Sequence, residues 1–377
     1  MRGLCSALGL LLLPWAAFAS LEDRRAELQP RLEAAFNDIF KDVNPPDEVG
    51  IFCYLVRGGE SMMLEYRLSG VTADTSFRIA SGTKMFTACA VAKLILDGKL
   101  DLEGPVTRYI PENYLIPDRD KITLHMLLNH KSGIFDPTNA DIPENLKLPF
   151  SGRDYTDYIQ ESDPDHTFTC DEYFALISKY QLQEGPPGGS YYCNMNYALL
   201  TEIIGRAAGT GATEFIAANT IVPAGMEHTF IPENGGDRAL PAPFLHGYAW
   251  TDRAAGKVRD ATGRNPSVFI GSGNIVSTPR DMTRFVKWLL HTPMGQIMKP
   301  PPEEGYGLGM MRKGSGYGND GAFNGYYSIM FYNEELDLAW CIVINLCDFS
   351  GDFGFQVNRM TQFQDEMVKI VGDADRK

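Results

Sequence analysis

A serine three residues before a lysine, at the start of an apolar stretch, constrains this chain more than any other feature. Ser81 and Lys84 precede an apolar run that opens at Met85. If a helix begins at Ser81, the two side chains lie one turn apart on the same face, where the amine reaches the hydroxyl. Unpaired N–H groups at the helix start favour negative charge beside the serine. The pair therefore predicts a nucleophilic serine whose base is a lysine with a lowered pKa.

A second motif, a tyrosine two residues before an asparagine, also precedes an apolar helical stretch. Tyr192 and Asn194 are followed by the apolar run 198–208. A phenol beside Lys84 could be stabilised as a phenolate and act as general base and acid. The amide of Asn194 can hydrogen-bond both the lysine and an acyl-amide group of a substrate. Alone, each motif is also what chance or an ordinary turn produces, but the two in this order indicate one catalytic site.

Together with three further segments, these motifs resemble the serine β-lactamase and DD-peptidase superfamily, in particular its class C β-lactamase and D-alanyl-D-alanine carboxypeptidase branch. The further segments are 124–134, 269–282 and 306–310, and the resemblance runs from about residue 77 to about residue 347. It implies an α+β fold of the β-lactamase and transpeptidase type. It also implies an oxyanion hole made by the backbone N–H groups of Ser81 and Ala322.

The third motif of that family is altered here. The family places a His or Lys two residues before a glycine, on a strand that edges the active site, whereas this chain has Asn319 and Asp320 before Gly321 and Ala322. By the resemblance, Asn319, Gly321 and Ala322 contact the substrate, as Asn194 does. An amide supplies no positive charge, and the Asp320 carboxylate is expected to repel an anionic substrate at short range. We therefore predict acyl-transfer chemistry with a weakened preference for substrates that carry a carboxylate.

The first 19 residues predict export. They combine a charged start, an apolar core from Leu8 to Leu13 and the small–X–small triplet Ala17-Phe18-Ala19. This is the pattern of a signal peptide, and the core is too short for a membrane-spanning helix, which needs about 20 residues. We expect a secreted or periplasmic protein that starts near Ser20 and has no stable membrane anchor.

The net charge and the histidine and cysteine spacing limit the kinds of partner and cofactor that the protein is expected to bind. The chain has 34 Lys and Arg against 48 Asp and Glu, a net charge of −14, which argues against nucleic acid and anionic membranes as partners. Its six histidines and seven cysteines show no metal-ligand spacing, so neither a metal nor another cofactor is expected. Cys53 and Cys341 fall on apolar strand patterns and are predicted to be buried thiols, while disulfide pairing and oligomeric state stay open. The expected partner is a small-molecule or peptide substrate.

The pattern of the chain predicts a split architecture within one domain, residues 20–377. An antiparallel sheet should come from about 20–80 and 265–377, flanked by helices, with a mostly helical region without strands inserted at about 81–264. The segment 136–166 is interpreted as an insertion over the active site. On the segment 124–134, His125 and His130 are interpreted as structural residues that hold a turn. In the sheet region we expect helices over 21–40, 282–290 and 356–371, the first of them interrupted at Pro30. We expect strands over 49–56, 61–66, 326–332 and 338–346.

Three functions stay open. The resemblance implies a penicillin-binding-protein-like peptidase or carboxypeptidase that forms an acyl-enzyme on Ser81. An esterase or amidase that acts on substrates without a carboxylate fits Asn319 and Asp320 better. A non-catalytic binding protein that retains the fold is the third, supported by Asn319 alone. The chain contains no Gly-X-Ser-X-Gly elbow, which argues against an α/β-hydrolase.

Overall fold

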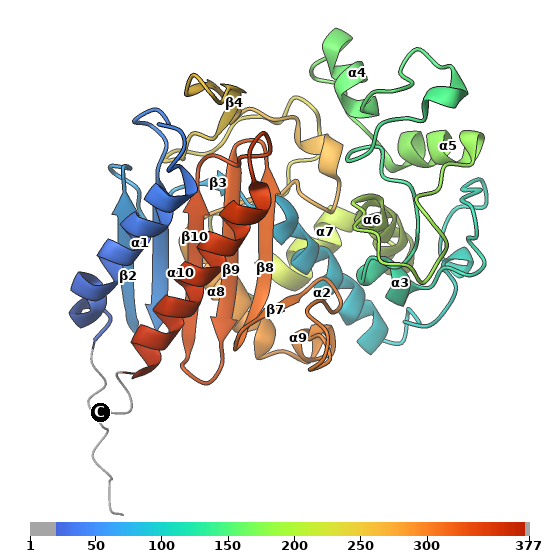
Figure 1. Cartoon of the computed structure of the whole chain (residues 1–377). Helices are drawn as coiled ribbons and strands as arrows, with labels where there is room; N and C mark the ends of the chain where they lie inside the picture. Colours follow the sequence, from blue (N-terminus) through green and yellow to red (C-terminus); the bar gives the residue numbers. More distant parts are fainter. Residues whose placement is uncertain (1–19, 374–377) are drawn as a thin grey trace, which may run out of the picture.

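The computed structural model of the chain describes residues 20–373, and the predicted signal segment 1–19 lies outside them (Figure 1). A six-stranded antiparallel sheet in the order β2-β1-β10-β9-β8-β7 forms the centre of the molecule. Two strands come from the N-terminal part of the chain and four from the C-terminal part. The strands are β1 (Ile51–Arg57), β2 (Glu60–Tyr66), β7 (Met311–Lys313), β8 (Gly316–Phe323), β9 (Tyr326–Asn333) and β10 (Leu338–Ile344). The predicted fold class is confirmed.

The two terminal helices cover one face of this sheet. Figure 1 shows α1 (Arg25–Ile39) and α10 (Phe353–Asp373) side by side against the strands. Leu28, Leu32 and Phe36 are buried along one side of α1, at the spacing of successive turns. The helix continues through Pro30, so the interruption that the proline suggested does not occur. The buried apolar side chains before and after the proline stabilise the helix although the proline has no backbone N–H to donate.

The opposite face of the sheet packs against helices from the inserted region and from the C-terminal part of the chain. α8 (Pro279–Leu290) contacts β9 and β10, and α2 (Thr83–Leu96) lies in the same apolar core. Every residue from Thr83 to Ala92 is buried, so α2 is a central helix rather than a surface one. The remaining helices are α3 (Leu124–Leu128), α4 (Tyr155–Ser162), α5 (Cys170–Tyr180), α6 (Met195–Ala208), α7 (Ala212–Ile216) and α9 (Pro293–Met298).

One expectation about the inserted region is wrong, because it contains a β-hairpin. β4 (Tyr248–Asp252) pairs with β5 (Lys257–Asp260), and a second short pair joins β3 (Phe77–Arg78) to β6 (Val276–Ser277). Of the hairpin residues only Ala249 is fully buried. The hairpin therefore lacks the alternation of buried and exposed residues by which a strand is recognised in a sequence. Within residues 20–373, no helix is long and apolar enough to cross a membrane.

The cysteines of the described residues are all free thiols. Cys53 and Cys341 are fully buried, which confirms the prediction for these two side chains. They belong to the apolar clusters on opposite faces of the sheet, Cys53 with α1 and α10 and Cys341 with α2 and α8.

Candidate active site

Ser81 lies on a tight turn that leads into the central helix. A 3₁₀ turn, Ala80–Gly82, runs directly into α2 at Thr83, so the α-helix begins two residues later than expected. Ala80 has a φ of 47°, in the left-handed region that a residue with a Cβ rarely adopts. Such strain persists where the surrounding structure enforces it and is concentrated at functional sites. The turn places the Ser81 hydroxyl at the floor of a cleft.

Lys84 is completely buried and directed at the serine. Its Nζ lies 3.1 Å from Ser81 Oγ, 2.8 Å from Asn194 Oδ1 and 3.0 Å from the backbone oxygen of Ser272. Burial lowers the pKa of Lys84 to about 7, and the nearby Asp136 carboxylate opposes part of this shift. An amine with this pKa is substantially unprotonated at neutral pH, so it can accept the serine proton.

Tyr192 forms the shortest contact with the nucleophile. Its hydroxyl lies 2.6 Å from Ser81 Oγ, and Lys84 Nζ lies 4.8 Å from the centre of its ring. The side chain is 51% exposed toward the cleft, but desolvation of its hydroxyl raises the pKa of Tyr192 well above its ordinary value. The free site therefore holds a neutral phenol, which differs from the phenolate considered on sequence grounds. The neighbouring lysine, with a pKa of about 7, is only partly charged at neutral pH and supplies too little positive charge to stabilise that phenolate.

Asn194 is held in one orientation by a carboxylate that the sequence analysis did not single out. The Asn194 backbone N–H donates to Asp136 Oδ2 at 2.6 Å, and its side-chain Nδ2 donates to Thr138 Oγ1 at 3.0 Å. Thr138 in turn donates to Asp136 Oδ1 at 2.7 Å. The amide oxygen is thereby directed at Lys84. Asp136 is buried, which raises its pKa against the effect of these hydrogen bonds.

His130 supports the tyrosine motif from behind. Its Nδ1 accepts a hydrogen bond from the Cys193 backbone N–H at 3.1 Å, its Nε2 lies 3.2 Å from the Tyr306 hydroxyl, and its ring lies 4.4 Å from the ring of Tyr192. Burial and the charge of Lys84 lower the pKa of His130 to about 3. It is therefore a neutral ring that positions the motif, in keeping with its interpretation as a structural residue.

The altered third motif lies on β8, and both of its polar side chains have partners in the protein. Asn319 is buried and donates from Nδ2 to the backbone oxygen of Gly309 at 3.0 Å. Asp320 accepts from Lys313 Nζ at 2.7 Å and from the Tyr327 hydroxyl at 3.2 Å. The Asp320 carboxylate, which was expected to repel an anionic substrate, is thus balanced by Lys313 on the adjacent strand β7.

Gly321 and Ala322 bring the backbone of β8 against the nucleophile turn. A Cβ on Gly321 would lie 2.1 Å from the backbone oxygen of Ile79 and 3.1 Å from the backbone nitrogen of Ser81, so no larger residue fits there. Ala322 follows at once and lines the same cleft as Ser81. The two residues whose N–H groups are expected to form an oxyanion hole therefore lie on adjoining segments.

The cleft around these residues has a volume of about 490 Å³. Besides Ser81, Tyr192 and Asn194 it is lined on one side by Phe349, Phe353 and Val357, from the start of α10 and the loop before it. In the part of the chain that the structure describes, no group of three or more His, Cys, Asp or Glu side chains is arranged to hold a metal ion. The site has the size and the mixed polar and apolar lining of a small-molecule cleft.

An antiparallel sheet from both ends of the chain, with Ser81 and Lys84 at the start of a central helix, is the architecture of the β-lactamase and transpeptidase class. The comparisons agree with this assignment. The chain belongs to the Beta-lactamase family, whose model matches residues 40–354.

Relatives within this family have different names. The chain is 29% identical over 213 residues to the esterase EstB of Burkholderia gladioli, covering 53% of this chain and 51% of the relative. It is 27% identical over 271 residues to the putative penicillin-binding protein PbpX of Bacillus subtilis (strain 168), covering 69% and 60%. The chain thus spans between half and three fifths of these two relatives. The D-amino acid amidase of Ochrobactrum anthropi SV3, solved with L-phenylalanine, superposes with a TM-score of 0.68 at 26% identity, over 93% of this chain and 99% of that chain.

Proposed function

We propose that the protein hydrolyses ester or amide bonds through an acyl-enzyme on Ser81. The observation that carries this proposal is the pair of contacts at Ser81 Oγ, 3.1 Å to Lys84 Nζ and 2.6 Å to the Tyr192 hydroxyl. A hydroxyl held between an amine with a pKa of about 7 and a neutral phenol has both a proton acceptor and a proton donor at contact distance.

Acylation follows from this arrangement. Neutral Lys84 takes the Oγ proton as Oγ attacks the carbonyl carbon, and the electron pair of the C=O bond moves onto oxygen. The N–H groups of Ser81 and Ala322 stabilise that oxyanion. As the C–N or C–O bond breaks, Tyr192 gives its hydroxyl proton to the leaving nitrogen or oxygen. The proton held by Lys84 then restores the phenol, and the site returns to its starting charge.

Deacylation reuses the same groups in the reverse direction. A water molecule in the cleft loses a proton to the Tyr192 and Lys84 pair while its oxygen attacks the ester carbonyl of the acyl-enzyme. The proton finally returns to Ser81 Oγ as the acid leaves. Asn194, fixed by Asp136 and Thr138, positions both the lysine and the acyl group.

The leaving group that the site suits best is one without a free carboxylate. Asn319 has no charge, and its side-chain amide donates a hydrogen bond to the Gly309 backbone oxygen. The Lys313 ammonium is paired with Asp320. The β8 wall therefore offers no unpaired cation to a C-terminal carboxylate. This favours an esterase or amidase over a D-alanyl carboxypeptidase. The names of the esterase and D-amino acid amidase relatives support the same choice. Export, suggested by the pattern of residues 1–19, remains part of the proposal.

Two covalent probes and three kinds of substrate test the function. We expect a neutral fluorophosphonate to label the purified protein stoichiometrically, and a fluorescent penicillin, which carries a carboxylate, to label it far more slowly. Neutral 4-nitrophenyl esters and amino-acid amides should be hydrolysed faster than peptides ending in D-Ala-D-Ala. Comparable labelling by both probes, with efficient release of D-alanine, would instead support the carboxypeptidase. No reaction with either probe would support the non-catalytic binding protein and refute the proposal.

A further inference from the structure

Arg264 lines the catalytic cleft and packs against Phe323 at the end of β8. Its guanidinium carbon lies 4.8 Å from the ring centre of Phe269 and 5.8 Å from that of Phe323. These two rings are nearly parallel, with an interplanar angle of 6° and centroids 6.2 Å apart. All three residues line the cleft that contains Ser81. The two rings restrict the guanidinium to a narrow range of positions at the cleft wall.

The guanidinium has no polar partner among residues 20–373. Its Nε is buried and makes no hydrogen bond, and no carboxylate forms an ion pair with it. By contrast, Arg238 pairs with Asp165 at 2.9 Å and Arg253 with Asp348 at 2.8 Å. The exposed Arg259 resembles Arg264 in forming no ion pair within residues 20–373. A partly buried cation without a partner is costly unless an anion or a hydrogen-bond acceptor completes it. The arrangement is that of a binding group whose partner is a ligand.

The charges around Arg264 leave it available to such a ligand. Asp157 and Asp154, from the start of α4, act on it from beyond contact distance and raise its pKa, whereas burial, the largest influence, and the nearby Arg259 lower it. The net direction is downward, but a guanidinium keeps its proton at neutral pH even so. The two aspartates therefore partly offset the positive charge of Arg264, but they form no hydrogen bond with its guanidinium N–H groups.

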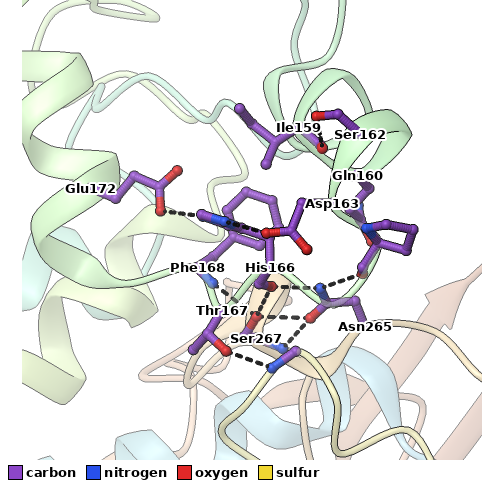
Figure 2. Close-up of polar contacts among 12 residues, drawn as sticks. Ile159, Gln160, Ser162, Asp163, His166, Thr167, Phe168, Glu172, Asn265 and Ser267 are labelled. Atoms are coloured by element: carbon purple, nitrogen blue, oxygen red, sulfur yellow. Dashed lines mark hydrogen bonds and ion pairs between the residues drawn. The ribbon is translucent and has the colours of Figure 1, made fainter.

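The segment that carries Arg264 is rigidly fixed. Figure 2 shows Asn265 and Ser267, directly after it, hydrogen-bonded to the loop around His166. Asn265 Nδ2 donates to the backbone oxygen of His166 at 2.8 Å, and Ser267 Oγ accepts from the backbone N–H of Phe168 at 3.0 Å. A cation held on so firm a support loses little further freedom when it binds a ligand.

The order of residues along β8 shows which part of a substrate reaches Arg264. Asn319 comes before Ala322 on the strand, and Phe323, which contacts Arg264, comes after it. A substrate whose carbonyl oxygen lies at the Ala322 amide therefore extends toward Asn319 at one end and toward Arg264 at the other. Arg264 and Asn324 also line a second cavity of about 280 Å³, so the cleft leaves room beyond this point.

We propose that Arg264 binds a carboxylate on the end of the substrate opposite the third motif, which makes the preferred substrates half-esters or half-amides of dicarboxylic acids. This rests on the acyl-enzyme function proposed above and specifies its substrate class. A planar guanidinium with a free edge matches a carboxylate by two parallel hydrogen bonds, which a point charge cannot reproduce. The leaving group remains one without a carboxylate.

The test compares two series of fluorophosphonates, of graded chain length, that differ only in a terminal carboxylate or carboxamide. We measure the second-order rate of Ser81 labelling. The wild-type protein should prefer the carboxylate probe by about tenfold at the best chain length, the worth of a charge-assisted hydrogen bond. Arg264→Met, which keeps an unbranched apolar stem against the two rings, should abolish this preference because labelling by the carboxylate probe falls to the rate of the carboxamide probe.

Arg259→Met is the matched control, since it removes one positive charge near Arg264 from an exposed residue that lines the second cavity but not the catalytic cleft. It should retain the preference. Should Arg264→Met fail to fold, Arg264→Lys, which keeps the charge but not the planar fork, should lower the preference severalfold. Equal rates for both probes at every chain length, or a preference that survives both Arg264 variants, would overturn the proposal. Failure of the carboxamide probe to label Ser81 at all would instead refute the acyl-enzyme function beneath it.

Discussion

The cleft has two walls that are built in different ways. On the helical wall, Ser81, Lys84, Tyr192 and Asn194 direct their polar groups at one another, so a single hydroxyl is surrounded by groups that can move its proton. On the wall formed by β8, the polar side chains have partners within the protein, although Asp320 still lines the cleft. Asn319 donates to Gly309, and Asp320 pairs with Lys313.

This difference separates reactivity from recognition. The helical wall contains every side chain that the proposed chemistry requires, while β8 contributes its backbone and a glycine small enough to approach the nucleophile turn. A change on the helical wall should therefore reduce turnover of all substrates. A change on β8 should alter which substrate is preferred and leave the chemical step nearly unaffected.

Replacing the nucleophile gives the largest expected effect. Ser81→Ala should lower turnover by about 10⁴-fold or more and abolish covalent labelling, because no other group at the site can form the acyl-enzyme. Activity with a neutral ester and mass spectrometry of the fluorophosphonate adduct measure this. An adduct on a peptide that lacks Ser81 would show that the nucleophile, and with it the catalytic cleft, has been assigned wrongly.

Tyr192→Phe should have the next largest effect, because the leaving group loses its proton donor and the attacking water loses part of its base. We expect turnover to fall by about 10²–10⁴-fold, the usual contribution of a positioned acid–base group. Single-turnover kinetics should show accumulation of acyl-enzyme if deacylation suffers more than acylation. Turnover close to that of the wild type would mean that Lys84 alone moves the protons.

The titration of Lys84 should control the pH dependence. With a pKa of about 7, the lysine loses its proton as the pH rises through neutrality, and only the neutral amine accepts the Ser81 proton. For a neutral ester, kcat/KM should therefore fall by about tenfold per pH unit below this pKa and level off above it. Enzyme preincubated at low pH and assayed at pH 8 controls for acid inactivation. A flat profile from pH 5.5 to 8 would contradict the assignment of Lys84 as the base.

Restoring the third motif should give the smallest effect, confined to substrate preference. Asn319→His together with Asp320→Thr introduces an imidazole that can carry a positive charge on β8 and frees Lys313 from its partner. The ratio of kcat/KM for a substrate with a leaving-group carboxylate to that for its neutral analogue should rise by about tenfold, equivalent to about 1.4 kcal/mol. Turnover of the neutral substrate should change little.

Lys313→Met provides the opposite control for that experiment. It leaves the Asp320 carboxylate without its balancing ammonium, so the same ratio should fall severalfold. If neither variant changes the ratio of kcat/KM values, then β8 does not contact the leaving group. The β8 wall would then have no part in substrate recognition.

The features that could be predicted from the sequence are those whose geometry is local. Ser81 and Lys84 meet because three residues at a helix start fix their separation, and the strands of the central sheet carry long buried runs such as β10, where every residue is buried. The family resemblance then placed Tyr192 and Asn194 beside them, and the structure brings all four together.

The features that could not be predicted depend on contacts between distant segments. Asp136 looks like any polar loop residue until the structure places it under the Asn194 backbone. The ion pair between Lys313 and Asp320 requires the register of β7, a strand of three residues, on β8. Arg264 belongs to no motif, and its role depends on two phenylalanines that the fold brings to it. The boundaries of the signal segment and of the domain stay predictions.

The close approach of Gly321 to the nucleophile turn has a consequence for the order of events during synthesis. About 240 residues separate Ser81 from Ala322 in the sequence. At a synthesis rate of about 5–20 residues per second, the ribosome adds β8 between about 10 and 50 seconds after the serine. Until β8 pairs with β9, the backbone N–H of Ala322 has no fixed position next to Ser81, and the proposed oxyanion hole is incomplete. A growing chain therefore carries the proposed nucleophile for most of its synthesis before the second amide of the proposed oxyanion hole is in place.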